Sequence, residues 1–545
     1  MAACAFSWQS RFRDAVEAGG RGVTGAFDAR LRQRIILQSR TEAACHSVLF
    51  DTALFAQKVE IDGVFCLGRS VESIVEDLKP LLSVRSGQSA TETRVNLKEQ
   101  ETELKAYVAN QRRENKMAFL FGHAKTSYTH HQSSISLPTK SGSKTSFADL
   151  IKSATPPCRL NPFLFNGHLQ TMWTAVKDDG PPVYYKRKIY ESTHSVYPGQ
   201  FTVDFVVSKD EGLASKNDET LPERTTFYSQ DEWTDVGSQD TKPMLVCLHG
   251  LSGGSHEVYL RQCVAPVTST GWEACVVNGR GCAMSKITTP RLFNARATWD
   301  VRQLVDHLRE LFPNRPLYAV GFSLGANILT NYVAEEGEGC VLKAAVACSN
   351  PWNLEIANVA LQRSWLGLEV YSSVMGGNLR RLYELHRTEL LKAEELDDEK
   401  IMKCKYLHEF DRAVQAPSWG YPTETAYYRD AQSADAVVAI KIPFLAINAE
   451  DDPISSMEAI PYEEFKQNPY TVLCCTNWGG HLSWFQFGGR RWFADAVVAF
   501  LTKLHEEVDV DELPAGKKVE ANDKVPTKKY PIFDPCNRRL VLPPK

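Results

Sequence analysis

From residue 243 onward, short apolar runs alternate with longer amphipathic stretches along the chain. The apolar runs are rich in β-prone residues and are bounded by turn residues, which is typical of buried strands. The stretches between them carry apolar residues at helical spacing. Strands are expected at 244–248, 273–277, 317–322, 342–347, 444–447 and 470–475, and helices at 257–264, 298–312, 326–334 and 491–508. Such alternation predicts an α/β fold, in which helices cover both faces of a mostly parallel, doubly wound sheet.

Two patterned stretches lie outside this alternation. Residues 182–190 and 201–207 alternate apolar and polar positions, so we expect an antiparallel hairpin there. Residues 352–436 are largely helical and interrupt the succession of strands. We expect them to form a lid over the sheet, with most of their apolar side chains packed in the lid's own core.

The remaining stretches set the domain boundaries. Residues 1–116 show no clear pattern and are treated as an N-terminal extension of unknown fold. Residues 117–158 form a lead-in segment, and the abundance of Ser, Thr, His and Lys at 123–147 indicates a mobile linker within it. The main domain is expected at 159–508, and residues 509–545, rich in Lys, Glu and Pro, form a C-terminal tail.

A serine stands at the junction of a predicted strand and a predicted helix, in the sequence Gly321-Phe-Ser-Leu-Gly325. A tight strand-to-helix turn brings backbone against backbone, so it needs small residues two positions before and after its centre. The turn would hold the Ser323 hydroxyl out of the sheet, and the amide of Leu324 would point at the same place. The pattern is short and also fits an ordinary turn, so its partners along the chain decide its meaning.

A nucleophilic serine needs a histidine base and a carboxylate that orients the histidine. In this arrangement the acid follows the serine along the chain and the histidine comes last. Strand 444–447 runs into an Ala-Glu-Asp-Asp-Pro sequence at the edge of the sheet where ligands bind. We take Asp452 as the acid, with Asp451 as the alternative. His481 follows two glycines after the next strand, and we take it as the base.

A second hydrogen-bond donor to the oxyanion should follow an earlier strand. The sequence His249-Gly-Leu-Ser-Gly-Gly254 does so, and its glycines allow the amide of Leu251 to face the same oxygen as the amide of Leu324. His249 and Gly250 of this loop are candidate substrate-binding residues.

A third candidate for substrate binding is His168. It lies in segment 159–173, which mixes large apolar side chains with Asn, His and Gln and therefore suits a position over a pocket. A core histidine whose hydrogen bonds are satisfied fits the same position, so both interpretations of His168 stay open.

Composition and charge exclude several other functions. The net charge is −4 and no basic stripe is present, so we expect no nucleic-acid partner. The 14 cysteines include no Cys-x-x-Cys pair and no Cys/His zinc spacing, which favours buried thiols in the cytoplasm and no metal or cofactor. No apolar run reaches the roughly 18 residues of a membrane-spanning helix. Peripheral contact with membranes or lipid droplets stays open.

Several motifs together resemble those of the α/β-hydrolase superfamily. The chain is similar in particular to the abhydrolase branch that contains YheT-like esterases, abhydrolase-domain lipases and yeast ethyl-ester synthases. The resemblance covers roughly residues 117–508. Its motifs are Asn161-Pro-Phe-Leu-Phe-Asn-Gly-His-Leu-Gln-Thr171, His249-Gly-Leu-Ser-Gly-Gly254, Asn278-Gly-Arg-Gly-Cys282, Phe410-Asp-Arg412, Gly420-Tyr421, Tyr427-Tyr-Arg-Asp430, Asn448-Ala-Glu-Asp-Asp-Pro453 and Gly479-Gly-His481.

This resemblance implies a serine ester hydrolase or acyltransferase that acts on medium-chain or glycerol esters. Its substrates would be an acyl ester, or acyl-CoA and an alcohol, and both reactions would run through one acyl-enzyme on Ser323. Arg280 could bind an acidic group of such a substrate or form a salt bridge with Asp300. The alternative from another class is a relative that binds lipid without catalysis, although every triad position is filled here.

Overall fold

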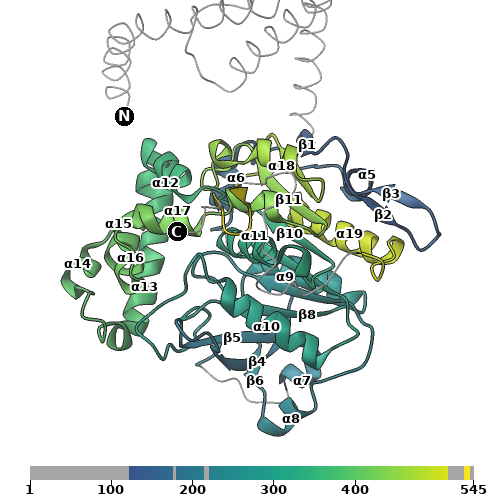
Figure 1. Ribbon diagram of the computed structural model, residues 1–545. Helices are drawn as coiled ribbons and strands as arrows, with labels where there is room; N and C mark the ends of the chain where they lie inside the picture. Colours follow the sequence, from purple (N-terminus) through teal and green to yellow (C-terminus); the bar gives the residue numbers. More distant parts are fainter. Residues whose placement is uncertain (1–121, 176–179, 214–219, 514–532, 541–545) are drawn as a thin grey trace, which may run out of the picture. The chain divides into compact units, whose positions relative to one another are not determined.

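The computed structural model describes residues 122–175, 180–213, 220–513 and 533–540 (Figure 1). The expected extension 1–116 lies outside these residues, as does most of the predicted tail 509–545. Of the helices in the described residues, none has the combination of length and apolar character that a membrane crossing requires.

A ten-stranded sheet lies at the centre of the described chain, in the order β1-β12-β11-β10-β9-β7-β8-β5-β4-β6 (Figure 1). Strands β12, β11, β10, β9, β7 and β8 are parallel neighbours, whereas β1, β5 and β4 join antiparallel. The hairpin expected at 182–190 and 201–207 is the β4–β5 pair. The strands are β1 Thr126–His130, β4 Tyr184–Glu191, β5 Gln200–Val207, β6 Thr225–Phe227, β7 Met244–Leu248, β8 Glu273–Asn278, β9 Leu317–Phe322, β10 Ala344–Cys348, β11 Phe444–Ala449 and β12 Thr471–Thr476.

The sheet is buried on both faces, which explains the continuous apolar runs in the sequence. Strand β7 shows how this works, because its side chains alternate between two hydrophobic cores. Leu245 and Cys247 point into one core, and Met244, Val246 and Leu248 point into the other.

Helices cover the two faces separately. The first core is closed by α5 Phe147–Ala154, α9 Val258–Ser269 and α19 Trp492–Glu507. The second is closed by α10 Thr298–Leu311, α11 Leu324–Glu336 and α18 Tyr462–Gln467. The predicted doubly wound α/β architecture is therefore confirmed.

The helical stretch between β10 and β11 forms a group beside the sheet (Figure 1). It has a core of its own, in which Leu379, Tyr383 and Phe410 pack against Leu292 and Phe293 of the segment after β8. We call this stretch the lid. Its elements are α12 Leu354–Arg363, η2 Leu366–Ser372, α13 Ser373–Leu390, α14 Asp398–Lys403, α15 Leu407–Phe410, η3 Asp411–Gln415, α16 Ala416–Ser418, α17 Glu424–Ala431 and η4 Ala434–Ala439.

The prediction of a mobile linker at 123–147 is wrong. Residues 126–130 form β1, which pairs along its whole length with β12 and extends the sheet at one edge. An edge strand is held to its neighbour by backbone hydrogen bonds. Polar side chains that face solvent therefore do not prevent the strand from forming. Tyr128 also packs against the first core, which gives the strand an apolar anchor.

The remaining helices and strands are short. Within residues 208–242, β6 adds a strand next to β4. The other elements are β2 Ser136–Pro138, β3 Lys144–Ser146, α6 Gly167–Trp173, α7 Lys209–Leu213, α8 Gln230–Thr234, η1 Gly337–Gly339, η5 Met457–Ala459, β13 Phe533–Asp534 and β14 Arg539–Leu540.

Two adjacent glycines of α13 test how tightly the lid is packed. A Cβ atom on Gly376 would lie 2.5 Å from the carbonyl oxygen of Lys405, whereas one on Gly377 would meet no atom within 4 Å. We expect Gly376→Ala to lower the free energy of unfolding by about 1–3 kcal/mol, because backbone must move. Gly377→Ala should instead raise it by up to about 1 kcal/mol through helix propensity. Urea unfolding measures both, and equal effects would contradict the close packing of α13.

Candidate active site

Ser323 occupies the turn between β9 and α11, with φ +53° and ψ −116°. This backbone is strained for a residue with a side chain, and it holds the hydroxyl out of the sheet. The glycines on either side are required by space. A Cβ atom on Gly321 would lie 2.5 Å from the carbonyl oxygen of Gly325, and one on Gly325 would lie 2.4 Å from that of Leu248. The expected tight turn is therefore present.

The structure brings Ser323, His481 and Asp452 into one hydrogen-bonded line. Nε2 of His481 lies 2.9 Å from the Ser323 hydroxyl oxygen. Nδ1 of His481 lies 2.8 Å from Oδ2 and 3.1 Å from Oδ1 of Asp452. All three residues follow the carboxyl ends of parallel strands, β9, β11 and β12, which meet at one edge of the sheet.

The geometry distinguishes between the two aspartates. The Asp452 side chain is fully buried against His481 and accepts hydrogen bonds from the amides of Ile454 and Ser455, both at 2.8 Å. These two amides fix the carboxylate in the orientation that receives the imidazole. Asp452, our first choice, therefore has the geometry of the acid.

Asp451 supports the loop that carries the histidine. Its Oδ1 accepts hydrogen bonds from the amides of Gly479 at 2.9 Å and Gly480 at 3.1 Å. Burial raises the pKa of Asp451 to about 6, although these amides act in the opposite direction. From the other side of the loop, the amide of His481 donates to the Thr171 hydroxyl at 2.9 Å. Residues of two other segments, Asp451 with Asp452 and Thr171 of the segment before β4, thus position the imidazole.

The amides expected to bind an oxyanion lie on the two loops next to Ser323. Leu324 is the first residue of α11, and Leu251 follows β7. Neither amide donates to an acceptor among the described residues. Both side chains also line a cavity that Ser323 reaches.

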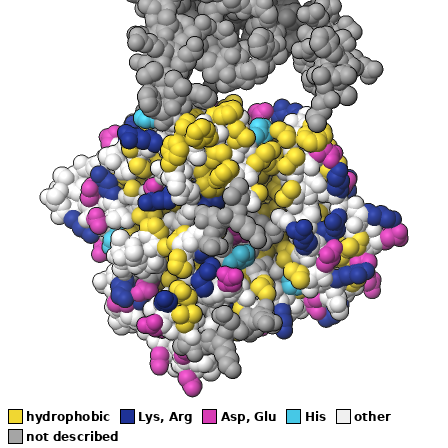
Figure 2. Space-filling view, turned by 180° about the vertical axis from the view of Figure 1, so that it is seen from behind, with side chains coloured by type: hydrophobic (Ala, Val, Ile, Leu, Met, Phe, Trp, Pro, Cys, Tyr) yellow, Lys and Arg dark blue, Asp and Glu magenta, His cyan; other side chains and the backbone are white. Residues whose placement is uncertain are grey.

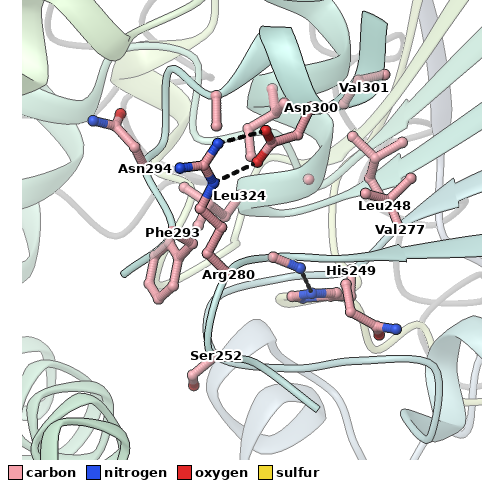
Figure 3. Close-up of a pocket in the computed structure, with 15 residues that line it drawn as sticks. Leu248, His249, Ser252, Val277, Arg280, Phe293, Asn294, Asp300, Val301 and Leu324 are labelled. Atoms are coloured by element: carbon pink, nitrogen blue, oxygen red, sulfur yellow. Dashed lines mark hydrogen bonds and ion pairs between the residues drawn. The ribbon is translucent and has the colours of Figure 1, made fainter. Parts of the chain in front are cut away.

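The imidazole of His249, which is labelled in Figure 3, determines where the Leu251 amide points. The amide of Gly279 donates to Nε2 at 2.9 Å, so the ring proton sits on Nδ1, which donates to the Gly250 carbonyl at 2.6 Å. That carbonyl and the Leu251 N–H belong to the same planar trans peptide, so the N–H points away from the imidazole. The Tyr259 hydroxyl accepts from the Gly250 amide at 2.8 Å and fixes the preceding peptide.

The three candidate substrate-binding residues have different surroundings. Both ring nitrogens of His249 form hydrogen bonds with backbone groups. These hydrogen bonds support a role in positioning the loop after β7, whereas we had expected His249 to contact the substrate. Gly250 lines the larger cavity described below. His168 stacks on Tyr371 of the lid, and its Nδ1 lies 2.9 Å from the Tyr371 hydroxyl. Burial lowers the pKa of His168.

Two cavities meet at Ser323. The larger has a volume of about 670 Å³ and is also lined by His481, Gly250, Leu251 and Trp173. The smaller has a volume of about 90 Å³, lies under the lid and is lined almost entirely by apolar side chains. Ser323 therefore lines both a large cavity with polar and apolar walls and a small cavity with mostly apolar walls.

Comparison with known proteins agrees with this geometry. A family model described as an alpha/beta hydrolase fold matches residues 243–476. A monoacylglycerol lipase of Saccharomyces cerevisiae is 38% identical over 369 residues, which cover 64% of this chain and 81% of that protein. The chain belongs to the α/β-hydrolase family. With serine, histidine and aspartate in contact, this α/β-hydrolase is an enzyme of the serine esterase and lipase class.

Two further relatives of this α/β-hydrolase are named for lipid esters. The medium-chain fatty acid ethyl ester synthase/esterase 2 of Saccharomyces cerevisiae is 32% identical, and the match covers 64% of this chain and 86% of that protein. The human phospholipase ABHD3 is 28% identical, and the match covers 59% of this chain and 72% of that protein.

Arg280 of the α/β-hydrolase forms the salt bridge that we expected with Asp300 (Figure 3). Its Nε and Nη2 donate to the two carboxylate oxygens at 2.9 and 2.8 Å, and its remaining hydrogen bonds go to the carbonyls of Pro198 and Tyr197. These contacts support a structural role. In the described residues, no group of three or more His, Cys, Asp or Glu side chains is placed to hold a metal ion.

Sequence reasoning missed Thr171, Tyr259 and Asp451 as residues that position the site. Thr171 is the last residue of the first motif of the family resemblance, so the motif could have indicated its role. No motif indicated the role of Tyr259, because in the sequence it looks like one more aromatic residue of an amphipathic helix.

His249 provides a test of the oxyanion loop through pH. Burial lowers the pKa of His249 to about 4, below the usual value of about 6.5 in an unfolded chain. The unfolded chain therefore binds the proton first, and stability that is present above pH 6.5 is lost as the pH falls toward 4. This loss amounts to about 3 kcal/mol.

We expect His249→Gln to be less stable than the wild type at pH 7 but to lose about 3 kcal/mol less between pH 7 and pH 4, since glutamine does not titrate. Urea unfolding at a series of pH values measures the difference. Parallel stability profiles would contradict a neutral, buried imidazole.

Proposed function

We propose that this α/β-hydrolase cleaves medium-chain acyl esters, acylglycerols among them, through an acyl-enzyme on Ser323. The observation that carries the proposal is the line of hydrogen bonds from Ser323 through His481 to Asp452, which opens on both cavities. The names of the two yeast relatives support this class of substrate.

The first half of the reaction forms the acyl-enzyme. Nε2 of His481 takes the proton of the Ser323 hydroxyl while the oxygen attacks the ester carbonyl. Asp452 holds the imidazole and stabilises its positive charge. The amides of Leu251 and Leu324 bind the oxyanion, and each such donor is typically worth about 3 kcal/mol in the transition state. His481 then gives the proton to the leaving alcohol.

The second half returns the enzyme to its starting state. His481 takes a proton from an acceptor in the larger cavity, and the acceptor oxygen attacks the acyl carbon. The bond between the acyl carbon and the Ser323 oxygen then breaks as His481 returns the proton to that oxygen. Water gives hydrolysis, whereas an alcohol gives a new ester. Because both acceptors use the same acyl-enzyme, the balance depends on how far water is excluded from that cavity. We propose hydrolysis as the main reaction and transfer to short alcohols as a second one.

Triad variants test this proposal with 1-octanoylglycerol as the substrate. We expect Ser323→Ala to show no turnover and no labelling by a fluorophosphonate probe. Asp452→Asn should lower kcat about 10⁴-fold. Asp451→Asn should lower it tenfold or less, roughly the worth of one hydrogen bond, since the amide oxygen still accepts from the loop.

Circular dichroism controls for folding of each variant. A larger loss in Asp451→Asn than in Asp452→Asn would reverse the assignment of the acid. Product analysis with octanoyl-CoA and ethanol separates the two acceptors, and we expect both octanoate and ethyl octanoate to disappear in Ser323→Ala. If the wild type is not labelled by the probe, the ligand-binding alternative replaces catalysis.

We further propose that the enzyme takes its substrate from a lipid surface. Residues 160–176 contain no charged side chain apart from a histidine, and within them Phe163 is 77% and Trp173 44% exposed. Phe487, which is 67% exposed, contacts the ring of Phe163. Trp173 also lines the larger cavity, so this apolar surface continues into the site. Figure 2 shows hydrophobic side chains gathered on the upper part of one face of the molecule.

The double variant Phe163→Ser/Phe487→Ser tests this surface, because neither residue lines a cavity that Ser323 reaches. We expect at least about tenfold weaker binding to phosphatidylcholine vesicles, since apolar area no longer enters the lipid. Turnover of soluble p-nitrophenyl butanoate should stay unchanged. Leu385→Ser is a matched control, since Leu385 is 74% exposed on lid helix α13. Equal loss of vesicle binding in the control would remove the assignment.

A further inference from the structure

A buried carboxyl group lies in the wall of the smaller cavity. Asp411 begins η3 of the lid, in the Phe410-Asp-Arg412 motif to which the mechanism assigns no role. Its exposed fraction is 6%, and it lines the same cavity as Ser323. A carboxyl group so close to the reacting serine, outside the triad, requires a physical explanation.

The surroundings of Asp411 are apolar. The cavity walls include Leu354, Leu361, Met375 and Leu407 from the lid. Among the described residues, the hydrogen bond that Asp411 receives comes from the Tyr428 hydroxyl, at 2.7 Å. Burial raises the pKa of Asp411 to about 7, which reflects how poorly this wall solvates a charge.

A second polar group faces the same space. Asn358 of α12 lines the cavity, and its buried Oδ1 has no hydrogen-bond partner among the described residues. Acceptor atoms on Asn358 and Asp411, from different lid elements, therefore interrupt an otherwise apolar wall. A saturated hydrocarbon chain that lies against these acceptor atoms cannot donate hydrogen bonds to them. It would also exclude the water molecules that could donate such hydrogen bonds.

We infer that the smaller cavity receives the acyl group of the ester, and that the Asp411–Tyr428 pair limits how long an acyl chain it accepts. This inference rests on the proposed function, because it assumes an ester bound at Ser323. It makes the pair a determinant of specificity rather than of catalysis.

The size of the cavity supports this assignment. Its volume is about 90 Å³, against about 670 Å³ for the larger cavity. In the smaller space an acyl chain lies close to the walls, and a longer chain must displace a wall or cover its polar atoms. The larger cavity offers more polar side chains, among them Thr171, Glu257 and Asn378, and so suits the alcohol part of the ester.

The double variant Asp411→Val/Tyr428→Phe tests the inference. It removes both polar partners together, so neither is left buried without a hydrogen bond. The substrates are p-nitrophenyl butanoate, octanoate and dodecanoate, which differ in the acyl chain alone. We expect the wild type to cleave the dodecanoyl ester least well. In the double variant, the ratio of kcat/KM for the dodecanoyl ester to kcat/KM for the butanoyl ester should rise about tenfold.

Two control variants separate specificity from folding. Asp411→Asn keeps the size and polarity of the wall, so the dodecanoyl ester should remain the poorest substrate. Tyr383→Phe/Asp398→Asn removes another Tyr–Asp hydrogen bond of the lid, at 2.8 Å, whose residues line neither cavity at Ser323. Its chain-length ratio should equal that of the wild type.

Three results would overturn the inference. The first is a wild type that prefers the dodecanoyl ester. The second is a chain-length ratio in Asp411→Val/Tyr428→Phe within about twofold of the wild type, which corresponds to less than about 0.5 kcal/mol. The third is the same shift in the ratio in both double variants. Failure of the proposed function looks different, because no p-nitrophenyl ester would then acylate Ser323 and the probe would not label it.

Discussion

The active site depends on the close contact between the start of α11 and the end of β7. A Cβ atom on Gly325 would lie 2.4 Å from the carbonyl oxygen of Leu248 and 2.5 Å from that of His249, so only glycine allows the two backbones to meet. Leu324 immediately precedes Gly325, and Leu251 lies two residues after His249. One steric constraint therefore brings the two amides that we propose for the oxyanion to the serine, before any side chain of the site is considered.

The catalytic groups lie on loops, and each loop is fixed by buried hydrogen bonds from elsewhere in the chain. The His249 ring ties the loop after β7 to the loop after β8 through Gly279. Asp451 and Thr171 hold the loop of His481 from two sides. Rigid supports of this kind let a loop carry a reactive side chain without losing its geometry. They also explain why buried polar residues surround the triad.

The fold and the meeting of Ser323, His481 and an acidic residue could be predicted because each leaves a local pattern. The apolar runs mark strands, the glycines around Ser323 mark a tight turn, and the order of acid and base follows from the order of the strands. The choice between Asp451 and Asp452 could not be made in the same way, since adjacent residues share one local environment in sequence. It depends on which carboxylate faces His481, which only the folded loop determines.

The differences between expectation and structure have physical causes as well. His249 was expected at the substrate, and the hydrogen bond that its Nε2 accepts comes from the amide of Gly279, 30 residues away, which no local pattern reveals. Residues 123–147 were taken for a linker because the backbone bonds between β1 and β12 do not depend on side-chain polarity. The contact of Thr171 with His481 spans 310 residues and leaves no spacing that a sequence pattern could reveal.

The lid leaves the sheet after β10 and returns at β11, and these two strands are direct neighbours in parallel register. The lid helices between them, residues 354–431, add no strand to the sheet, so their length can change without shifting a strand, and the entropic cost of closing the insertion grows only slowly with its length. Ser323 precedes the insertion, whereas Asp452 and His481 follow it. The lid could thus be replaced by the lid of a relative while the strands and the three site residues keep their positions. Such a graft would change the substrate preference and leave the serine, histidine and aspartate in place.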